Sequence, residues 1–498
     1  MSDYYPNVLF HKLILANATT FGEREALVHD EQIVTFKQIP ELVTKIVGKL
    51  LELGVSPGDV VLVCLPNSIY YPLLFLASAT IGAVLTGISS ESTANEVKYA
   101  LEQSDAKIVF AFENFLNQND FVLSGVIVEK LPEKFQIYVD SISEPFVDLS
   151  ISQQDIDSIL LAPFSSGTTG APKCCQLTHR NFLASTFSLK RFLFDKLLAQ
   201  SSMKTLAFLP FHHASGFWAL LLCLLEGCTT YIMSEFHPIT MMEMVEKYQI
   251  DTINIVPPIA NLCLKMIHLQ GRCPSLRTIL CGSSGLTKDR CKRLLAIFPQ
   301  VKHLIQGYGM TELVVLSCVT PFDDNFKHLG SCGQILPEFE AKLLEHEGGE
   351  TELLLRSDAI MKFYKNGAPN LDEDGWLHTG DIVKEVDGFC YVVDRMKDLI
   401  KVNGFQVSPT EIENLILASP KVAEVAVVGI EDELCGQLPK AYIVLEKDAD
   451  ELLFLKHLEH TMKAKLSAVK QLRGGVSIVK ELPKSSSGKV QKNKLCYY

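Results

Sequence analysis

A nine-residue stretch, Ser165 to Lys173, reads SSGTTGAPK and combines small hydroxyl residues with two glycines, a proline and a lysine. Such residues bury little apolar surface, so the stretch must act through its backbone, its hydroxyl groups or its cation. Glycines allow successive backbone N–H groups to point at one anion, and hydroxyls and an ammonium group add further donors. The stretch is therefore a candidate phosphate site. Its candidate contacts are Ser165, Ser166, Gly167, Thr168, Thr169, Gly170 and Lys173.

The spacing within this stretch differs from the phosphate loop of common NTPases. That loop reads GxxxxGK[ST], whereas only Ala171 and Pro172 separate Gly170 from Lys173 here. A flexible surface linker is the alternative interpretation. SILLAPF before the stretch predicts a strand, and LTHRNFLASTF after it predicts a helix with Thr178 as its N-cap. We therefore predict a loop that connects a strand to a helix.

Further stretches carry groups that suit a nucleotide. QGYGMTE offers an aromatic ring at Tyr308 for a base, a hydroxyl at Thr311 for a phosphate and a carboxylate at Glu312 for Mg²⁺. DGWLHTGD ends in Asp381, whose carboxylate can accept two ribose hydroxyls. A core tyrosine in a Gly-rich turn and an Asx turn beside a buried tryptophan are the structural alternatives.

Cations gather in two stretches nearer the C-terminus. DRMKDLIK supplies Arg395, Lys397 and Lys401, and PKSSSGKVQK places Lys489 after a Ser/Gly run. A solvated charged face and a disordered basic tail are the respective alternatives.

The segments around these residues alternate between apolar strands and amphipathic helices. ELVTKIVGKLLELG places Leu42, Ile46, Leu50 and Leu53 on one stripe, and VVLVCLP follows as a buried strand. This alternation indicates a parallel sheet, and it continues to about Glu340, after which shorter strands and Gly turns follow.

At 498 residues the chain exceeds the usual size of one core. We predict an α/β fold with a large multi-sheet body at 1–394, a hinge at 395–401 and a smaller mobile α+β domain at 402–498.

Composition excludes several classes of protein. The formal net charge of −12 disfavours nucleic acid and anionic membranes as partners. The most apolar run, FWALLLCLLEG, is about half of the roughly 20 residues that cross a bilayer. The N-terminus is poor for a signal peptide, the C-terminus has no peroxisomal SKL, and the fourteen cysteines form no CxxC pair. We predict a cytoplasmic location.

Taken together and in this order, these stretches resemble the adenylate-forming superfamily of acyl-CoA synthetases, 4-coumarate:CoA-ligase-like enzymes, peptide-synthetase adenylation domains and firefly-type luciferases. LPFHHASG is similar to the family's substrate-side histidine motif, and GSSGL stands where the family has its adenine-side GAAPL. The resemblance implies that ATP and Mg²⁺ activate a carboxylic acid, fatty or otherwise apolar, as an acyl-adenylate. Transfer to CoA would then give acyl-CoA and AMP.

The resemblance also implies a role for each matching residue. Lys489 bridges the acyl carboxylate and the α-phosphate, and His213 lies beside that carboxylate, with a satisfied core histidine as the alternative. Lys401, Gly404 and Gln406 belong to the face that serves the second half-reaction, and Lys397 lies at the hinge. The implied catalytic residues are Lys489, His213, Thr311, Lys401 and Gln406. The implied nucleotide contacts beyond the SSGTTGAPK stretch are Ser284, Gln306, Gly307, Tyr308, Gly309, Thr311, Asp381, Arg395 and Gly404, with Glu312 on the metal.

Several departures from the family pattern leave alternatives open. Cys174 and Asn403 replace a common Gly and Lys, and ELVVL brings apolar bulk after Thr311 where aromatic-acid ligases carry small residues and Pro. A luciferase-like or free-standing adenylating enzyme with another acceptor is one alternative. A catalytically inactive nucleotide-binding relative is the other, although Lys489, Glu312, Asp381 and Arg395 are all present.

Overall fold

The structure, a computed structural model, describes residues 4–118, 126–142, 154–165, 172–266, 270–282, 285–346, 349–403, 405–484 and 490–495. The chain divides into two compact units. The first comprises Met1–Glu340 and Arg356–Leu377, and the second comprises Ala341–Leu355 and His378–Tyr498. A hinge is located by comparing two orientations of the two units. The predicted hinge at 395–401 therefore stays a prediction.

The first unit contains a six-stranded sheet in the order β10-β7-β4-β3-β5-β6. Its central pairs are parallel, and every residue of β3 is buried, as expected for a strand covered on both faces. The predicted buried strand VVLVC is thus confirmed. The strands are β3 (Val60–Cys64), β4 (Val84–Ile88), β5 (Ala106–Phe112), β6 (Ile127–Leu131), β7 (Ile159–Leu161) and β10 (Leu177–Thr178).

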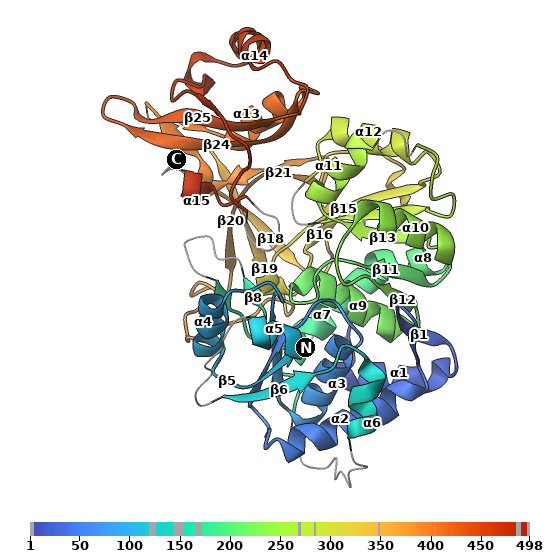
Figure 1. Ribbon diagram of the computed structural model, residues 1–498. Coiled ribbons are helices and arrows are strands. Elements are labelled where there is room, and N and C mark those ends of the chain that lie inside the picture. The colour runs from blue at the N-terminus through green and yellow to red at the C-terminus, as the bar shows by residue number, and fades with distance from the viewer. Residues whose placement is uncertain are drawn as a thin grey trace. The chain divides into compact units, whose positions relative to one another are not determined.

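A nine-stranded sheet follows the order β17-β16-β15-β14-β13-β11-β12-β1-β2 (Figure 1), and its strand β15 contains the predicted nucleotide contacts Gln306, Gly307 and Tyr308. In this order, all neighbouring strands between β15 and β1 are parallel. The outer pairs β1–β2, β15–β16 and β16–β17 are antiparallel. The strands are β1 (Glu25–His29), β2 (Gln32–Thr35), β11 (Lys204–Ala207), β12 (Thr229–Ile232), β13 (Thr252–Ile255), β14 (Thr278–Cys281), β15 (His303–Tyr308), β16 (Cys318–Val319) and β17 (Gln334–Ile335).

Helices cover both sheets of the first unit (Figure 1). The amphipathic segment ELVTKIVGKLLELG forms α2, whose inward stripe includes Ile46 and Leu50, and Thr178 caps α7 through a capping box with Asn181. Both predictions are confirmed. The helices are α1 (Phe10–Phe21), α2 (Gln38–Glu52), α3 (Tyr70–Ile81), α4 (Ala94–Ser104), α5 (Glu113–Gln118), α6 (Phe135–Ser141), α7 (His179–Leu189), α8 (Asp195–Leu198), α9 (Ala214–Glu226), α10 (Pro238–Tyr248), α11 (Pro257–Lys265) and α12 (Lys288–Ile297).

The described parts of the second unit combine two sheets with three α-helices. One sheet has the order β18-β19-β20-β21 and the other β23-β22-β25-β24, with β26 beside β25. The elements are β18 (Glu340–Glu345), β19 (Thr351–Arg356), β20 (Leu377–Val386), β21 (Phe389–Arg395), β22 (Ile400–Val402), β23 (Phe405–Val407), α13 (Pro409–Leu417), β24 (Val422–Asp432), β25 (Gly436–Leu445), α14 (Glu451–Lys465), β26 (Val476–Ile478) and α15 (Lys492–Leu495).

Alternate residues of β24 face two different cores. Val425 and Val427 pack with α13 and α14, whereas Ala426 and Val428 pack with Leu495 of α15 on the other face. Figure 1 shows α14 and α15 on opposite sides of this strand pair. The α/β class, with a large multi-sheet body and a smaller C-terminal unit, is therefore confirmed.

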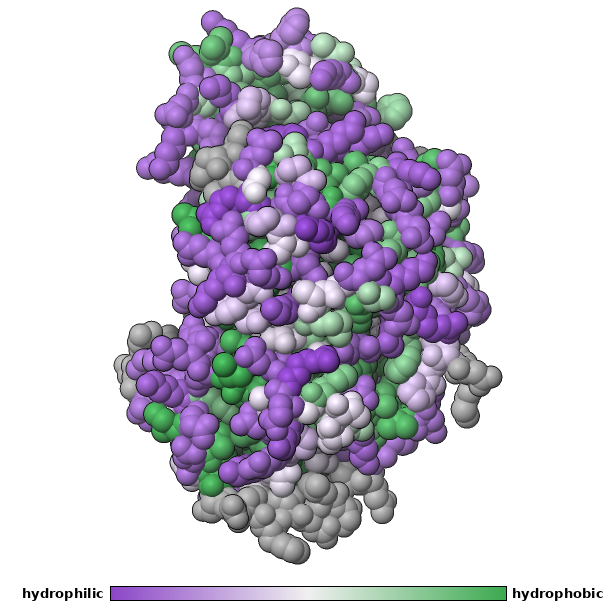
Figure 2. Space-filling view, turned by 90° about the vertical axis from the view of Figure 1, so that its right-hand side faces the viewer, coloured by the Kyte–Doolittle hydropathy of each residue, from purple (hydrophilic) through white to green (hydrophobic). Residues whose placement is uncertain are grey.

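Hydrophilic residues predominate on the face shown in Figure 2, and apolar residues appear there in scattered groups. None of the helices in the described parts of the chain combines the length and apolar character needed to cross a bilayer.

His11 and His179 are buried next to each other in the first unit, and both are neutral. His11 and His179 are 1% and 0% exposed, with ring centroids 5.3 Å apart, and Phe10 N–H donates to Nδ1 of His179. Burial first, and then the neighbouring His179 and Lys12, lower the pKa of His11 to about 3. Burial likewise lowers the pKa of His179 to about 4, against a weaker upward effect of Asp155.

These histidines should make stability fall in mild acid. An unfolded imidazole titrates near pH 6.5, so from there down to about pH 4 the unfolded state binds more protons than the folded state. As the pH is lowered through this range, the free energy of unfolding should decrease by up to ~1.4 kcal/mol per pH unit for each histidine. In urea unfolding from pH 7.5 to 4.5, His11→Leu should flatten this slope, whereas His457→Gln on an exposed position of α14 should not. An unchanged slope in His11→Leu would contradict the prediction.

Candidate functional site

The two ends of the SSGTTGAPK stretch pair with each other. β8 (Phe164–Ser165) and β9 (Lys173–Cys174) form an antiparallel pair in which Ser165 lies opposite Lys173. The prediction of a loop from strand to helix is therefore wrong: the stretch joins two strands, and α7 begins only at His179. The cause is the apolar sequence that follows Lys173, because Cys174, Cys175 and Leu177 are buried and extend the chain as strand. The predicted contacts Ser166, Gly167, Thr168, Thr169 and Gly170 lie outside the described residues.

Tyr364 contacts both Lys173, in the β8–β9 hairpin, and Glu312, the predicted metal ligand. The ammonium of Lys173 lies 4.9 Å from the centroid of the Tyr364 ring, within the range of a cation–π contact. The Tyr364 hydroxyl donates a 3.1 Å hydrogen bond to Oε1 of Glu312. Burial, and then Glu312, raise the pKa of the Tyr364 hydroxyl, so it stays protonated as a donor. The structure thus brings Lys173 and Glu312 together through a residue that the sequence did not single out.

Backbone contacts hold Glu312 in place. It lies in the 3₁₀ turn Thr311–Leu313, which follows β15, and its carbonyl accepts the N–H of Met361 at 2.9 Å. The same segment continues to Tyr364, which bridges to Cys175, and to Lys365, whose N–H donates to Cys174. The segment from Met361 to Lys365 therefore contacts both the turn that carries Glu312 and the chain that follows Lys173.

Gly307 and Gly309 allow the chain at the end of β15 to pass close to Val315 and Leu316. A Cβ at Gly309 would lie 1.9 Å from the carbonyl oxygen of Val315, and one at Gly307 would lie 2.8 Å from the Leu316 side chain. These residues are therefore required by packing next to Tyr308, which pairs with Cys318. We infer that they shape the predicted base site through the backbone.

Gln306, a predicted nucleotide contact, has its side-chain amide engaged by protein atoms. Its Oε1 accepts the N–H of Leu286 at 2.6 Å, and its Nε2 donates to the carbonyl of Ser331 at 3.0 Å. The side chain is 3% exposed. These contacts favour a role in holding the segment after GSSGL, whose Ser284 lies outside the described residues.

Val314 has a strained backbone directly after the Glu312 turn. Its φ and ψ are 70° and −60°, and Val315 N–H donates to the Leu313 carbonyl at 2.9 Å, which defines a γ-turn of the rare kind. A β-branched residue adopts positive φ only at an energetic cost. Val314 is completely buried, so the surrounding chain maintains this conformation.

This strain gives a direct prediction for stability. Glycine tolerates positive φ, whereas any residue with a Cβ loses about 1–2 kcal/mol there. We therefore expect Val314→Gly to unfold at a higher urea concentration than Val314→Ala, although Ala is the larger residue. At the neighbouring Val315, which lacks positive φ, the order should reverse. The same order at both positions would show that Val314 is not strained.

His212 and His213 begin α9 beside an aromatic cluster. Their rings lie 4.4 Å apart, and His213 is the N-cap residue of α9. Gly87 packs between His212 and Tyr71, since a Cβ there would lie 1.7 Å from the Tyr71 hydroxyl and 3.4 Å from Cβ of His212. Burial, and then His213, lower the pKa of His212 well below its usual range, so His212 is neutral.

The second unit brings the two predicted ribose contacts together. Asp381 on β20 and Arg395 on β21 are direct register partners, and Nε of Arg395 lies 3.2 Å from Oδ1 of Asp381. The Asp381 side chain is 5% exposed and the Arg395 side chain 40%. This ion pair brings together the carboxylate and the guanidinium that are both predicted to contact the ribose.

The predicted face for the second half-reaction lies on a hairpin of the same unit. Lys401 on β22 pairs with Gln406 on β23, and Gln406 Nε2 donates to Glu350 at 2.9 Å. Asn403 adopts a φ of 50° at the turn, and Gly404 lies outside the described residues, as does Lys489.

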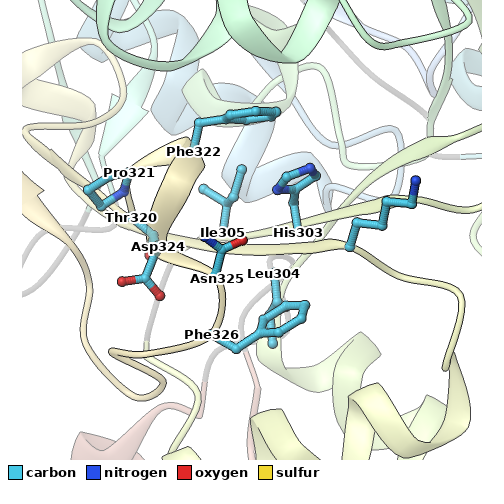
Figure 3. A pocket seen from close by; sticks show the side chains of 10 residues that line it. His303, Leu304, Ile305, Thr320, Pro321, Phe322, Asp324, Asn325 and Phe326 are labelled. Atoms are coloured by element: carbon cyan, nitrogen blue, oxygen red, sulfur yellow. The ribbon is translucent and has the colours of Figure 1, made fainter.

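Figure 3 shows a cavity at the start of β15, where the His303 ring stacks on Phe322 with centroids 4.2 Å apart. Its volume is about 10 Å³, which accommodates about one water molecule. The predicted contacts Gln306 to Gly309 and Thr311 lie at or just after the other, carboxyl-terminal end of β15, which is where open parallel sheets bind ligands. This cavity is therefore separate from the predicted site.

Comparisons with known proteins identify the family of this chain. The AMP-binding enzyme family matches residues 14–365, and the AMP-binding enzyme C-terminal domain matches residues 411–489. The chain is 30% identical to 4-coumarate–CoA ligase 2 of Nicotiana tabacum, over 99% of this chain and 95% of the relative. It is also 30% identical to peroxisomal OPC-8:0-CoA ligase 1 of Arabidopsis thaliana, over 93% and 88%.

Among solved structures, o-succinylbenzoate CoA synthetase of Bacillus subtilis in complex with its acyl-adenylate intermediate superposes with a TM-score of 0.82. The two are 25% identical, and the match covers 97% of each chain. The fold and site thus define an adenylate-forming enzyme. The chain belongs to the AMP-binding enzyme family, as its motifs predicted, and its relatives are CoA ligases, which confirms the predicted enzyme class.

Proposed function

We propose that this enzyme joins a carboxylic acid to CoA in two steps. A carboxylate oxygen first attacks the α-phosphorus of ATP, so that pyrophosphate leaves and an acyl-adenylate forms. The thiol sulfur of CoA then attacks the acyl carbon, AMP leaves, and the thiol proton is released. The observation that carries the proposal is the link from Lys173 on β9 through Tyr364 to Glu312 after β15, in which a cation and a carboxylate both contact the same tyrosine side chain.

The donor set at Glu312 fits Mg²⁺. Within the described parts of the chain, no cluster of three or more His, Cys, Asp or Glu side chains could enclose a metal ion. Mg²⁺ usually keeps several waters and binds one or two protein carboxylates together with substrate phosphates. Glu312 would hold the ion, which would neutralise phosphate charge when bound. The B. subtilis synthetase has been solved with ATP and a magnesium ion, which supports this assignment.

Charge is the main difficulty in the first step. A carboxylate and a triphosphate repel each other strongly in a site from which water is excluded, so positioned cations and hydroxyls are the chief catalytic need. We assign Lys173 and Thr311 to the phosphates, Asp381 and Arg395 to the ribose and Tyr308 to the base. Lys489 would neutralise the charge that develops between carboxylate and α-phosphate.

We further propose that the acid is fatty or otherwise apolar. Leu313 and Val314 are buried beside Glu312, and the His212–His213 pair lies next to Tyr71, whose ring packs on Phe217. These residues are themselves buried by protein, and it is the apolar character of the chain around the turn and the histidine pair that supports an apolar acid. The relatives named for coumarate make an aromatic acid the second candidate. A cytoplasmic location also remains a proposal, since one relative is named as peroxisomal.

Exchange of labelled pyrophosphate into ATP tests the proposal directly. We expect exchange only when a suitable acid is added, and consumption of CoA thiol only when acid, ATP and Mg²⁺ are all present. A panel that pairs aliphatic with aromatic acids identifies the substrate class. Acid-dependent exchange without CoA consumption would indicate another acceptor, as in a luciferase-like enzyme. Absence of exchange with every acid would favour an inactive nucleotide-binding protein.

A further inference from the structure

A buried carboxylate contacts the chain one residue before Asp381, the predicted ribose contact of the second unit. This carboxylate belongs to Glu352 on β19, which is 3% exposed. Its Oε1 accepts the N–H of Gly380 on β20 at 2.9 Å. Since Gly380 directly precedes Asp381, this hydrogen bond fixes the backbone from which the Asp381 side chain projects.

Two histidines contact the other oxygen of the same carboxylate. Nε2 of His346 lies 2.9 Å from Oε2 of Glu352, and Nδ1 of His378 lies 3.3 Å from that oxygen. Burial of a carboxylate costs free energy unless hydrogen-bond donors surround it. The two imidazoles and the Gly380 N–H supply these donors, and together they hold the carboxylate in one orientation.

Gly380 is the residue of this run whose backbone most needs such support. Its φ is 67°, and glycine has more conformational freedom than any other residue. Apart from its chain neighbours, a Cβ placed there would meet no atom of the described residues within 4 Å. Hydrogen bonds, rather than packing, therefore hold the chain at Gly380.

Thr379 adds a second connection between β19 and the chain at Asp381. Its Oγ1 donates to the carbonyl of Leu353 at 2.7 Å and accepts the N–H of Asp381 at 3.1 Å. Leu353 directly follows Glu352. Two consecutive residues of β19 thus hold the two residues that precede Asp381.

Stability alone does not account for a carboxylate at this position. The three residues that follow Glu352 on β19 are buried leucines, so an apolar residue at position 352 would continue the run. Exchanging buried charged groups for well-packed apolar residues is often neutral or stabilising, and fixed geometry is the better-attested benefit. The geometry fixed by Glu352 is that of the backbone next to Asp381.

We propose that Glu352 is a positioning residue that holds the Asp381 carboxylate where it accepts the ribose hydroxyls of ATP. This inference rests on the proposed function, which assigns Asp381 to the ribose. In this role Glu352 does not contact the nucleotide and acts through the backbone of Gly380. Its effect should therefore be confined to the part of the nucleotide affinity that depends on the ribose hydroxyls.

Calorimetric binding of ATP and of 2′,3′-dideoxy-ATP to the full chain, with Mg²⁺ and without acid, tests the inference. The analogue lacks both ribose hydroxyls. The unaltered chain should prefer ATP by about 10- to 100-fold, as expected for hydrogen bonds to a charged acceptor. Glu352→Met should lower this preference below about threefold, because ATP binding weakens while binding of the analogue stays within about twofold. Glu352→Gln keeps an acceptor for Gly380 and should retain most of the preference.

Glu413→Met is the matched control. Glu413 on α13 is a carboxylate of the same unit whose side chain is 15% exposed, and its Oε1 accepts the N–H of Val427 on β24 at 2.8 Å. Its replacement should leave the preference for ATP unchanged. Glu352→Asp is a second test variant if Glu352→Met folds poorly. It keeps the charge but withdraws the carboxylate from Gly380 by one methylene, so the preference should again fall.

An unchanged preference in Glu352→Met and Glu352→Asp would overturn the inference. Equal loss of affinity for ATP and for the analogue would also overturn it, because a merely structural role predicts that result, and so would a fall in preference in Glu413→Met. Asp381→Ala separates this failure from that of the proposed function. If Asp381→Ala loses the preference and Glu352→Met keeps it, only the positioning role is wrong. If Asp381→Ala keeps the preference, the assignment of Asp381 to the ribose is wrong, and the inference fails with it.

Discussion

Lys489→Ala should lower adenylate formation by about 10²- to 10³-fold and leave thioester formation from supplied acyl-adenylate almost unchanged. One charged contact to a developing oxyanion in a desolvated site contributes about 3–4 kcal/mol, which corresponds to this loss. The effect should be confined to the first half-reaction, because the second transfers an acyl group that is already activated. Rapid-quench measurement of acyl-adenylate and of acyl-CoA gives the two rates separately.

Lys494→Ala is the matched control for this experiment. Lys494 lies on an exposed position of α15, five residues after Lys489, and carries the same charge into solvent. Its replacement should leave both rates unchanged, since exposed charges contribute little. Equal loss of both rates in Lys489→Ala would remove Lys489 from its proposed role, and so would a comparable loss in Lys494→Ala.

Local sequence predicted the elements better than the contacts between them. The β3 run is apolar at every position because the sheet is covered on both faces, and the Thr178 cap is set by residues within one helical turn. Such features depend on near neighbours. The hairpin at Ser165 and Lys173 depends instead on the buried residues that follow Lys173. The glycines and hydroxyls of the stretch are compatible both with a loop from strand to helix and with a loop between two strands, so they could not distinguish the two.

The site residue that the sequence missed illustrates the same limit. Tyr364 lies in the segment MKFYKNG, which has no recognisable pattern, and its role arises only because it reaches both Lys173 and Glu312. Glu352 and Gly380 are likewise separated by 28 positions in the chain and meet only in the folded unit. By contrast, ELVVL did stand out in the sequence through its apolar bulk, but the positive φ of Val314 could not be predicted from it, because valine is a residue type that rarely adopts that conformation.

Glu312→Gln should lower kcat/KM for Mg–ATP by about 10²-fold and raise the Mg²⁺ concentration needed for half-maximal exchange. The substitution keeps the size of the side chain but removes the anionic charge that a hard cation requires. The fold should remain intact, because the turn is held by backbone contacts from Met361 that do not involve the carboxylate. Pyrophosphate exchange titrated with Mg²⁺ at fixed ATP measures both quantities.

Tyr364→Phe distinguishes the metal ligand from its hydrogen-bond partner. The variant retains Glu312 and the ring beneath Lys173 but removes the 3.1 Å hydrogen bond to the carboxylate. Such a bond contributes about 1–3 kcal/mol to a charged acceptor, so we expect a loss of about tenfold with little change in the Mg²⁺ requirement. If Glu312→Gln and Tyr364→Phe gave equal losses and neither shifted the Mg²⁺ titration, Glu312 would serve only to orient Tyr364, and the metal would have to be held elsewhere.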